Sequence, residues 1–142
     1  MSLFAALQVS ASGMQAERTR AETLVENMAN SETTRTPQGG PYKRKDVVFS
    51  SELQESPFSA VFQNELATGV NVAEITEDNS APDLRYMPSH PDANSEGYVA
   101  YPKMNPAMDM ADLLNTTRSY QANIAAMTAV KDMITHSIDL LR

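Results

Sequence analysis

The sequence contains no cysteine, and this absence excludes several kinds of chemistry at once. Without a thiol, the chain cannot form disulfide bonds, hold a metal through thiolates or use a cysteine nucleophile. Histidine is nearly as scarce, because only His90 and His136 occur, and neither stands in a set of side chains spaced for metal coordination. We therefore expect neither a metal site nor a cofactor.

Catalytic motifs are also missing from the sequence. The Gly39-Gly40 pair lacks the further glycines and the Lys-Ser/Thr of a phosphate-binding loop. No serine has the strand-turn-helix setting of a nucleophile, and the acidic residues between Glu65 and Asp83 lie among polar neighbours that favour a solvated surface. The sequence predicts a protein that is not an enzyme.

Positive charge and long apolar runs are both in short supply. Eleven Lys and Arg against eighteen Asp and Glu give a net charge of −7, which argues against a nucleic-acid partner. No run approaches the roughly 18 apolar residues of a membrane span, so direct membrane insertion is not expected. The first basic residue, Arg18, follows the apolar start instead of preceding it. We expect a chain that stays in the cytoplasm or leaves without a cleaved signal peptide.

Proline is absent from both ends, since all eight prolines lie between Pro37 and Pro106. Proline-free ends around a proline-rich centre predict a mainly α protein with a small β or irregular middle. We assign 1–30 and 106–142 to two terminal helices, paired as an antiparallel coiled-coil-like layer, and 31–105 to an extended joint and a small β-rich region. Only 6% of residues are aromatic and tryptophan is absent, which predicts thin packing.

Apolar residues recur at spacings of three and four along both ends, as on a helix that packs against another helix. Only Arg18 interrupts the first seam, and Lys131 interrupts the second. An ordinary two-helix hairpin in a monomer is one interpretation, but such long seams favour burial in an assembly of several subunits. The predicted assembly interface comprises Phe4, Leu7, Met14, Val25, Met28, Leu113, Tyr120, Ile124, Met127, Ile134 and Ile138.

Local signals place the other elements. Asn105 followed by Pro106 predicts the start of the second helix, because asparagine caps free amides and proline suits the first helical position. The β-branched runs "KDVVF" and "GVNVAEI" predict strands, and the alternation in the latter slips at Ala73 as it does at a β-bulge. The stretch "RYMPSHPDANSEGYVAYPKM" predicts a loop or hairpin with an aromatic cluster.

Laid out in this way, the chain resembles the flagellar rod and hook family of axial proteins over essentially its whole length. The similar segments are "SASGMQAERTRAETLVENMANSET" and "DMADLLNTTRSYQANIAAMTAVKDMI", and the loops "TTRTPQGGPYKRKDVVF" and "PSHPDANSEGYVAYPKMN" are similar to those of one rod member. The residues that carry the family signature are Asn27, Asn30, Arg118, Tyr120 and Asn123.

The resemblance implies a structural subunit of the proximal rod, in which the terminal helices form the inner layer of a tube that transmits torque from the motor ring to the distal rod and hook. A joint including Thr34, Gly39, Gly40 and Pro41 would turn the chain out of that layer. The implied partners are copies of itself, other rod proteins, the rod-to-ring adaptor, the MS ring and the type III export gate. The implied location is the basal body, within the periplasm after type III export.

Rod and hook proteins resemble one another in a short Phe-x-x-x-apolar export element. The chain offers Phe49 with Leu53, Phe58 with Phe62, and Phe62 with Leu66, and we favour Phe49 with Leu53 because this pair follows the joint directly. A different class of function also fits two long seams, namely a cytoplasmic coiled-coil adaptor or export chaperone. Such a protein would form a discrete dimer by itself.

Overall fold

The computed structural model describes residues 3–52 and 69–140. Within them lie two long helices and four strands, which pair into two separate two-stranded antiparallel sheets. In chain order the elements are α1 (Leu3–Ala29), β1 (Lys45–Glu52), β2 (Gly69–Glu77), β3 (Asp83–Tyr86), β4 (Tyr98–Tyr101) and α2 (Pro106–Asp139). The prediction of two long terminal helices around a small β middle is confirmed.

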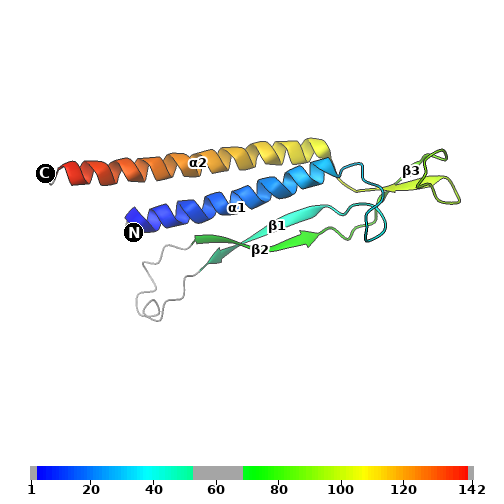
Figure 1. Cartoon of the computed structure of the whole chain (residues 1–142), viewed down its shortest axis with the longest axis horizontal. Helices are drawn as coiled ribbons and strands as arrows, with labels where there is room; N and C mark the ends of the chain where they lie inside the picture. The colour runs from blue at the N-terminus through cyan, green and yellow to red at the C-terminus, as the bar shows by residue number, and fades with distance from the viewer. Residues whose placement is uncertain (1–2, 53–68, 141–142) are drawn as a thin grey trace.

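The elements form an elongated molecule (Figure 1). α1 lies between α2 on one side and the β1–β2 sheet on the other, and the two helices run antiparallel. The β3–β4 hairpin projects beyond the end of the helix pair at which α1 finishes and α2 begins. The helix pair and this hairpin are therefore joined at one crowded junction.

α2 begins where the sequence predicts it. Asn105 has extended backbone angles (φ −119°, ψ 102°), and its side-chain oxygen accepts a 3.1 Å hydrogen bond from the backbone N–H of Ala107. Pro106 occupies the first turn, where its missing N–H costs nothing. Asp109 lies in the same turn, close to the positive end of the helix dipole. The start of α2 is thus determined by local chemistry.

The β1–β2 ladder contains the predicted bulge. Val48 pairs with Glu74, whereas the next residue, Phe49, pairs with Val72, so Ala73 has no partner across the ladder. One extra residue on β2 bends the strand and increases its twist. The bulge allows the sheet to follow the side of α1 (Figure 1).

The β3–β4 hairpin contains the predicted aromatic cluster. The rings of Tyr86 and Tyr98 meet edge to face, with centroids 5.3 Å apart. The guanidinium of Arg85 lies 4.5 Å from the ring centroid of Tyr101. Val99, which lies between Tyr98 and Tyr101 in β4, is fully buried, so the hairpin has a small core of its own.

The hydrophobic core of the described residues is thin, as the composition predicts. Side chains line the contact between the helices and the contact between α1 and the sheet, but few are fully covered. The buried hydrophobic residues are Ala16, Leu24, Val99, Tyr101 and Val130. Such a core leaves much of the apolar surface of both helices exposed.

Candidate assembly site

Asn27 ties the end of α1 to the start of β1. Its side chain is fully buried, and it both donates a 2.8 Å hydrogen bond to the carbonyl of Lys45 and accepts a 2.9 Å bond from the N–H of the same residue. The amide thus pairs with Lys45 as a neighbouring strand would. The Tyr42 hydroxyl donates a third bond, of 3.1 Å, to the Asn27 oxygen. This signature residue sets the direction in which the chain leaves the helix layer.

A charged pair lies beside that contact. The Lys45 ammonium is 2.6 Å from the Glu26 carboxylate and 5.8 Å from the centroid of the Tyr42 ring. Burial, followed by the nearby charge of Glu26, raises the pKa of Tyr42 to about 12. The phenol therefore keeps its proton, and its hydrogen bond to Asn27, up to strongly alkaline pH.

An ion pair connects β1 to the first turn of α2. Both Nε and Nη2 of Arg44 donate to one oxygen of Asp109, at 3.2 and 2.9 Å, although the two residues are 65 positions apart. Asp109 is 1% exposed. Burial alone would lower the pKa of Arg44, but the carboxylates of Asp109 and Asp46 raise it above its ordinary value. The pair holds α2 to the start of the sheet.

Ser12 and Gly13, in the first half of α1, each face a different layer. The Ser12 hydroxyl accepts a 3.1 Å hydrogen bond from the N–H of Val70 in β2. A Cβ placed on Gly13 would lie 3.2 Å from the Asn123 amide nitrogen in α2. Glycine therefore permits close approach of the helices, and Asn123, another signature residue, lies at their contact. The sequence reading did not assign these roles to Ser12 and Gly13.

The predicted joint is a compact loop that closes on itself. The N–H of Tyr42 donates to the carbonyl of Thr33, and the N–H of Thr36 donates to the carbonyl of Gly40. Gly39 and Gly40 have φ values of 89° and 76°, which is the left-handed region that glycine adopts at low cost. No described atom other than those of chain neighbours lies within 4 Å of a Cβ at either position, so backbone conformation and not space requires glycine there.

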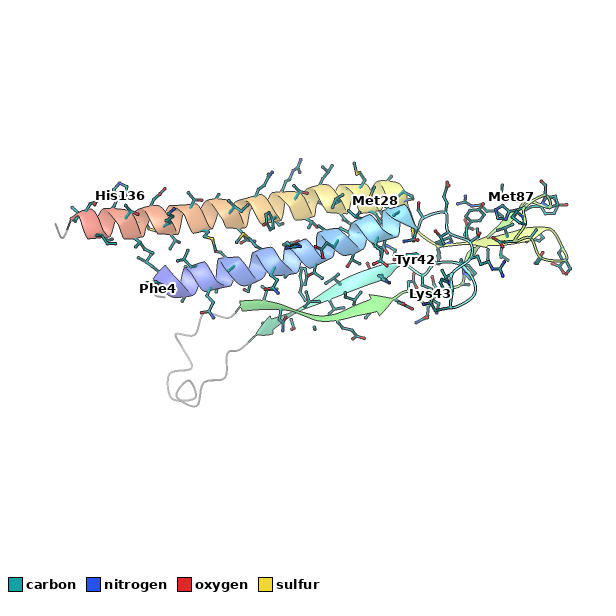
Figure 2. The ribbon with its side chains drawn as sticks, in the orientation of Figure 1. Phe4, Met28, Tyr42, Lys43, Met87 and His136 are labelled. Carbon is teal, nitrogen blue, oxygen red and sulfur yellow. The ribbon has the colours of Figure 1, made fainter. Side chains whose placement is uncertain are left out.

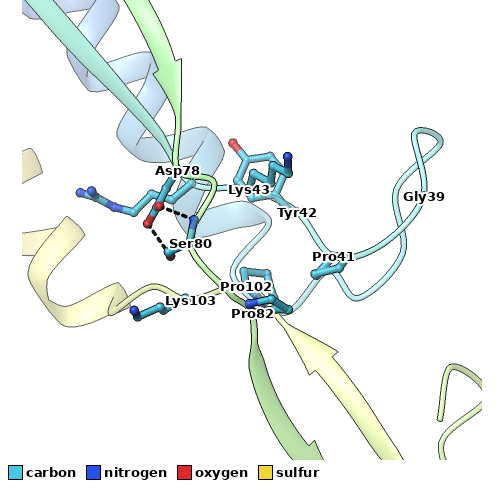
Figure 3. A pocket seen from close by; sticks show the side chains of 10 residues that line it. Gly39, Pro41, Tyr42, Lys43, Asp78, Ser80, Pro82, Pro102 and Lys103 are labelled. Carbon is cyan, nitrogen blue, oxygen red and sulfur yellow. Dashed lines mark hydrogen bonds between the residues drawn. The ribbon is translucent and has the colours of Figure 1, made fainter. Parts of the chain in front are cut away.

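Two further joint residues contact the rest of the junction. The Thr34 hydroxyl donates a 2.8 Å hydrogen bond to the carboxylate of Asp92, in the loop between β3 and β4. Pro41 lines a pocket of about 130 Å³ where the joint, the end of β2 and the approach to α2 cross (Figure 3). In that pocket Asp78 accepts hydrogen bonds from the backbone and hydroxyl of Ser80, which lower the pKa of its carboxyl.

Some of the predicted interface residues of both helices lie on one flank of the helix pair. Gly13 and Asn123 mark where the helices meet, and at 3.6 residues per turn Met14 and Ile124 lie about a quarter-turn away, on the same side. Met14 and Tyr120 line one shallow groove between the helices. The sheet contacts α1 through Ser12, on the other side. We call the eleven predicted interface residues together the helix-pair face.

Much of the helix-pair face is exposed. Phe4 is 76% exposed, Val25 52%, Tyr120 37%, Ile124 44% and Ile138 60%. Figure 2 shows Phe4 at one end of the pair and Met28 at the other, so the face runs along its length. The remaining members are half-buried: Leu7, Met14, Met28, Leu113, Met127 and Ile134.

The side chains that α2 buries against α1 differ from the predicted seam at several turns. Thr116 and Val130 are buried and Asn123 is half-buried, whereas the predicted interface has Ile124, and the predicted seam passes through Lys131. A stripe of apolar residues in the sequence identifies the apolar face of a helix. It does not show which positions on or beside that face contact the partner helix.

The other signature residues have distinct settings. Asn30 ends α1, because its side chain donates to the carbonyl of Glu26 and accepts from the hydroxyl of Thr33. Arg118 is exposed on α2. Of the favoured export element, Phe49 is a half-buried residue of β1 whose ring lies 5.6 Å from the Arg20 guanidinium. Leu53 lies outside the described residues, as do the alternatives Phe58, Phe62 and Leu66.

The described residues include no cluster of three or more histidine and acidic side chains placed to hold a metal ion. Over the same ranges, no helix combines the length and the apolarity that a membrane crossing needs. What this part of the chain does present is a braced junction and an exposed apolar flank.

Comparison with known proteins connects this arrangement to a family. The model of the C-terminal region of flagellar basal body rod FlgEFG proteins matches residues 95–140. The chain is 40% identical over 150 residues to flagellar basal-body rod protein FlgC of Bacillus subtilis, covering 99% of each chain. It is 34% identical over 151 residues to FlgC of Borreliella burgdorferi, covering 100% of this chain and 99% of the relative. It is also 31% identical over 140 residues to FlgC of Escherichia coli O157:H7, covering 99% and 98%. The chain therefore belongs to the FlgC family of flagellar basal-body rod proteins.

Proposed function

We propose that this chain is built into the flagellar rod through its helix-pair face. As a member of the FlgC family it is a structural rod protein and not an enzyme. The observation that carries the proposal is the exposed apolar flank that runs along both helices, with Phe4, Val25 and Ile138 each more than half exposed. Exposed apolar side chains that gather on one flank are typical of a protein interface.

The contact between the helices supports a coiled-coil-like inner layer. The buried and half-buried positions of α2 include two sets, and within each set they recur at spacings of three and four: Asp109, Leu113 and Thr116, then Asn123, Met127, Val130 and Ile134. Alternating spacings of this kind over several heptads are typical of a coiled-coil seam. We assign 1–30 and 106–142 to this inner axial layer, and 31–105 to an outer region that joins it.

The junction gives the subunit the stiffness that torque transmission needs. Asn27 fixes β1 to α1, and the Arg44–Asp109 pair fixes β1 to α2. Both contacts are at least partly shielded from water, where hydrogen bonds and ion pairs are harder to exchange for solvent. A load applied to the outer region would therefore pass into both helices.

The proposed partners follow from the family. We propose that the helix-pair face contacts other copies of this chain and other rod proteins, and that the rod meets the rod-to-ring adaptor and the MS ring. We also propose export through the type III gate to a rod within the periplasm, with Phe49 and Leu53 as the export element. The rival function, a cytoplasmic adaptor or export chaperone, is disfavoured by full-length similarity to proteins named as rod components.

A charge placed on the helix-pair face tests the proposal. Ile124→Asp would put a carboxylate into the interface, where an unpaired buried charge is strongly unfavourable. Asn115→Asp puts the same charge on an exposed position of α2 that lies half a turn around the helix from Ile124. We expect the Ile124 variant to be lost from purified basal bodies and the Asn115 variant to be retained. Equal retention of both would contradict the proposal, and a soluble cytoplasmic dimer absent from basal bodies would favour the rival.

A further inference from the structure

The β3–β4 hairpin is attached to the rest of the molecule mainly at its base. Among the described helices and strands, β3 and β4 come close only to each other. At the base, Pro82 and Pro102 line the junction pocket together with Pro41 (Figure 3). Proline has no backbone N–H, so these residues donate no hydrogen bond that would fix the direction of the hairpin. That direction therefore depends on contacts made further along it.

A single carboxylate makes the polar contacts between the hairpin and the joint. Within the described ranges, every hydrogen bond and ion pair that links residues 83–101 to the rest of the chain involves Asp92. The Thr34 hydroxyl donates to it at 2.8 Å, whereas Arg35 lies 3.9 Å away and is 83% exposed, so this ion pair adds little. We call the hydrogen bond between Thr34 and Asp92 the hairpin latch.

His90 shapes the loop that carries Asp92. Its Nδ1 accepts a 3.1 Å hydrogen bond from the backbone N–H of Asp92. A backbone N–H can only donate, so Nδ1 carries no proton and the imidazole is neutral in this arrangement. The ring is half-buried, and the backbone N–H of His90 donates to the carbonyl of Met87. The latch is therefore built on an uncharged histidine.

The other charged residues of the hairpin and of its contact with the joint are of types that do not titrate near neutral pH. Arg35 comes from the joint. Within the hairpin, Asp83 and Arg85 pair with each other at 3.4 Å, and Glu96 is exposed. Histidine is the side chain that ordinarily changes charge between about pH 5 and 8, so His90 is the group in this part of the chain that responds in that range.

We propose that the hairpin latch is a pH-sensitive switch, closed while His90 is neutral and opened when His90 takes up a proton. A proton on Nδ1 puts a donor in place of the acceptor for the Asp92 N–H, so that hydrogen bond is lost. The imidazolium also attracts the Asp92 carboxylate, in competition with the Thr34 hydroxyl. The hairpin is then fixed only at its base. Both states belong to a single chain, so the inference goes beyond the proposed function and does not depend on it.

Two spin labels measure the position of the hairpin directly, because the natural chain contains no cysteine. Ser95→Cys places one label on the hairpin loop and Ser119→Cys places the other on α2, and both positions are exposed. Pulsed electron paramagnetic resonance on the full chain gives the distribution of distances between the labels at about pH 8 and about pH 5.5, both above the range in which carboxyl groups ordinarily take up protons. We expect the distribution to be at least twofold wider at the lower pH.

Two variants define the closed and the open state. His90→Asn supplies a side-chain oxygen in the place of Nδ1, and asparagine accepts from the N–H two residues further on without titrating. We expect this variant to keep the narrow distribution at both pH values. Thr34→Val removes the hydroxyl with little change of shape, and we expect it to give the wide distribution at both.

Several results would overturn the inference. One is an equally narrow distribution at both pH values in the labelled chain with His90 and Thr34 intact. Another is the same widening in His90→Asn, because a different group would then cause it; His136, the chain's other histidine, lies at the far end of α2 (Figure 2) and is unchanged throughout. A narrow distribution in Thr34→Val would show that the latch does not hold the hairpin.

Amide hydrogen exchange provides a second measurement that needs no label. The unlabelled natural chain and His90→Asn would be compared at the same pH, so that the intrinsic dependence of exchange on pH cancels. We expect at least threefold faster exchange of residues 90–94 in the natural chain at about pH 5.5 and equal exchange at about pH 8. Equal exchange at both pH values would contradict the switch.

Discussion

Replacing Asn27 by alanine should destabilise the subunit by about 2–4 kcal/mol, because the variant loses three hydrogen bonds at a fully buried position. A neutral hydrogen bond contributes about 1 kcal/mol, and a buried partner left unsatisfied costs about 1–3 kcal/mol. Both the N–H and the carbonyl of Lys45 would lose their partner. Since the core is thin, this loss is a large part of a total stability near the low end of about 5–15 kcal/mol.

Urea unfolding followed by circular dichroism measures this effect. With a slope of roughly 2 kcal/mol/M, the midpoint should fall by about 1–2 M. Asn115→Ala is the matched control, because Asn115 is exposed on α2 and alanine is the better helix former. Asn27→Asp should fall in between, since a carboxylate can still accept from Lys45 but cannot donate to its carbonyl. If Asn27→Ala and Asn115→Ala unfold at the same urea concentration, the role assigned to Asn27 is wrong.

The remaining predictions concern the junction. Gly39→Val, at a φ of 89°, should cost about 1–3 kcal/mol and reduce motility, whereas Gln38→Ala should not, and equal motility would count against the joint. The folded-state pKa of Tyr42, about 12, exceeds the ordinary value of 10, so its contribution to stability is complete below pH 10 and is lost as the pH rises to 12. Tyr42→Phe should remove that pH dependence, and an unchanged alkaline profile would refute it. Asp109→Asn should lower the unfolding free energy by about 1–2 kcal/mol, less than for a fully buried pair because Arg44 is partly exposed; an unchanged urea midpoint would contradict this.

Local chemistry in the sequence determined where the main elements lie. The distribution of proline limited the helices to the two ends, and Asn105 with Pro106 marked the start of α2. The break in alternation at Ala73 indicated the bulge. Each of these signals acts over a few residues, through a cap, a fixed φ or a side-chain period of two, so no knowledge of distant contacts was needed.

Only the tertiary structure decided which flank of each helix is covered. The apolar stripe that is plainest in the sequence includes Ile124, which is 44% exposed, whereas α2 buries Thr116 against α1. Polar residues can be buried because distant groups satisfy them: Arg44 pairs with Asp109 across 65 positions, and the hydrogen bonds of Asn27 depend on the return of β1. Hydrophobic periodicity in a sequence shows which face of a helix is apolar. A polar side chain can be buried only where a partner satisfies its hydrogen bonds or its charge, and the path of the chain in space decides where that partner lies.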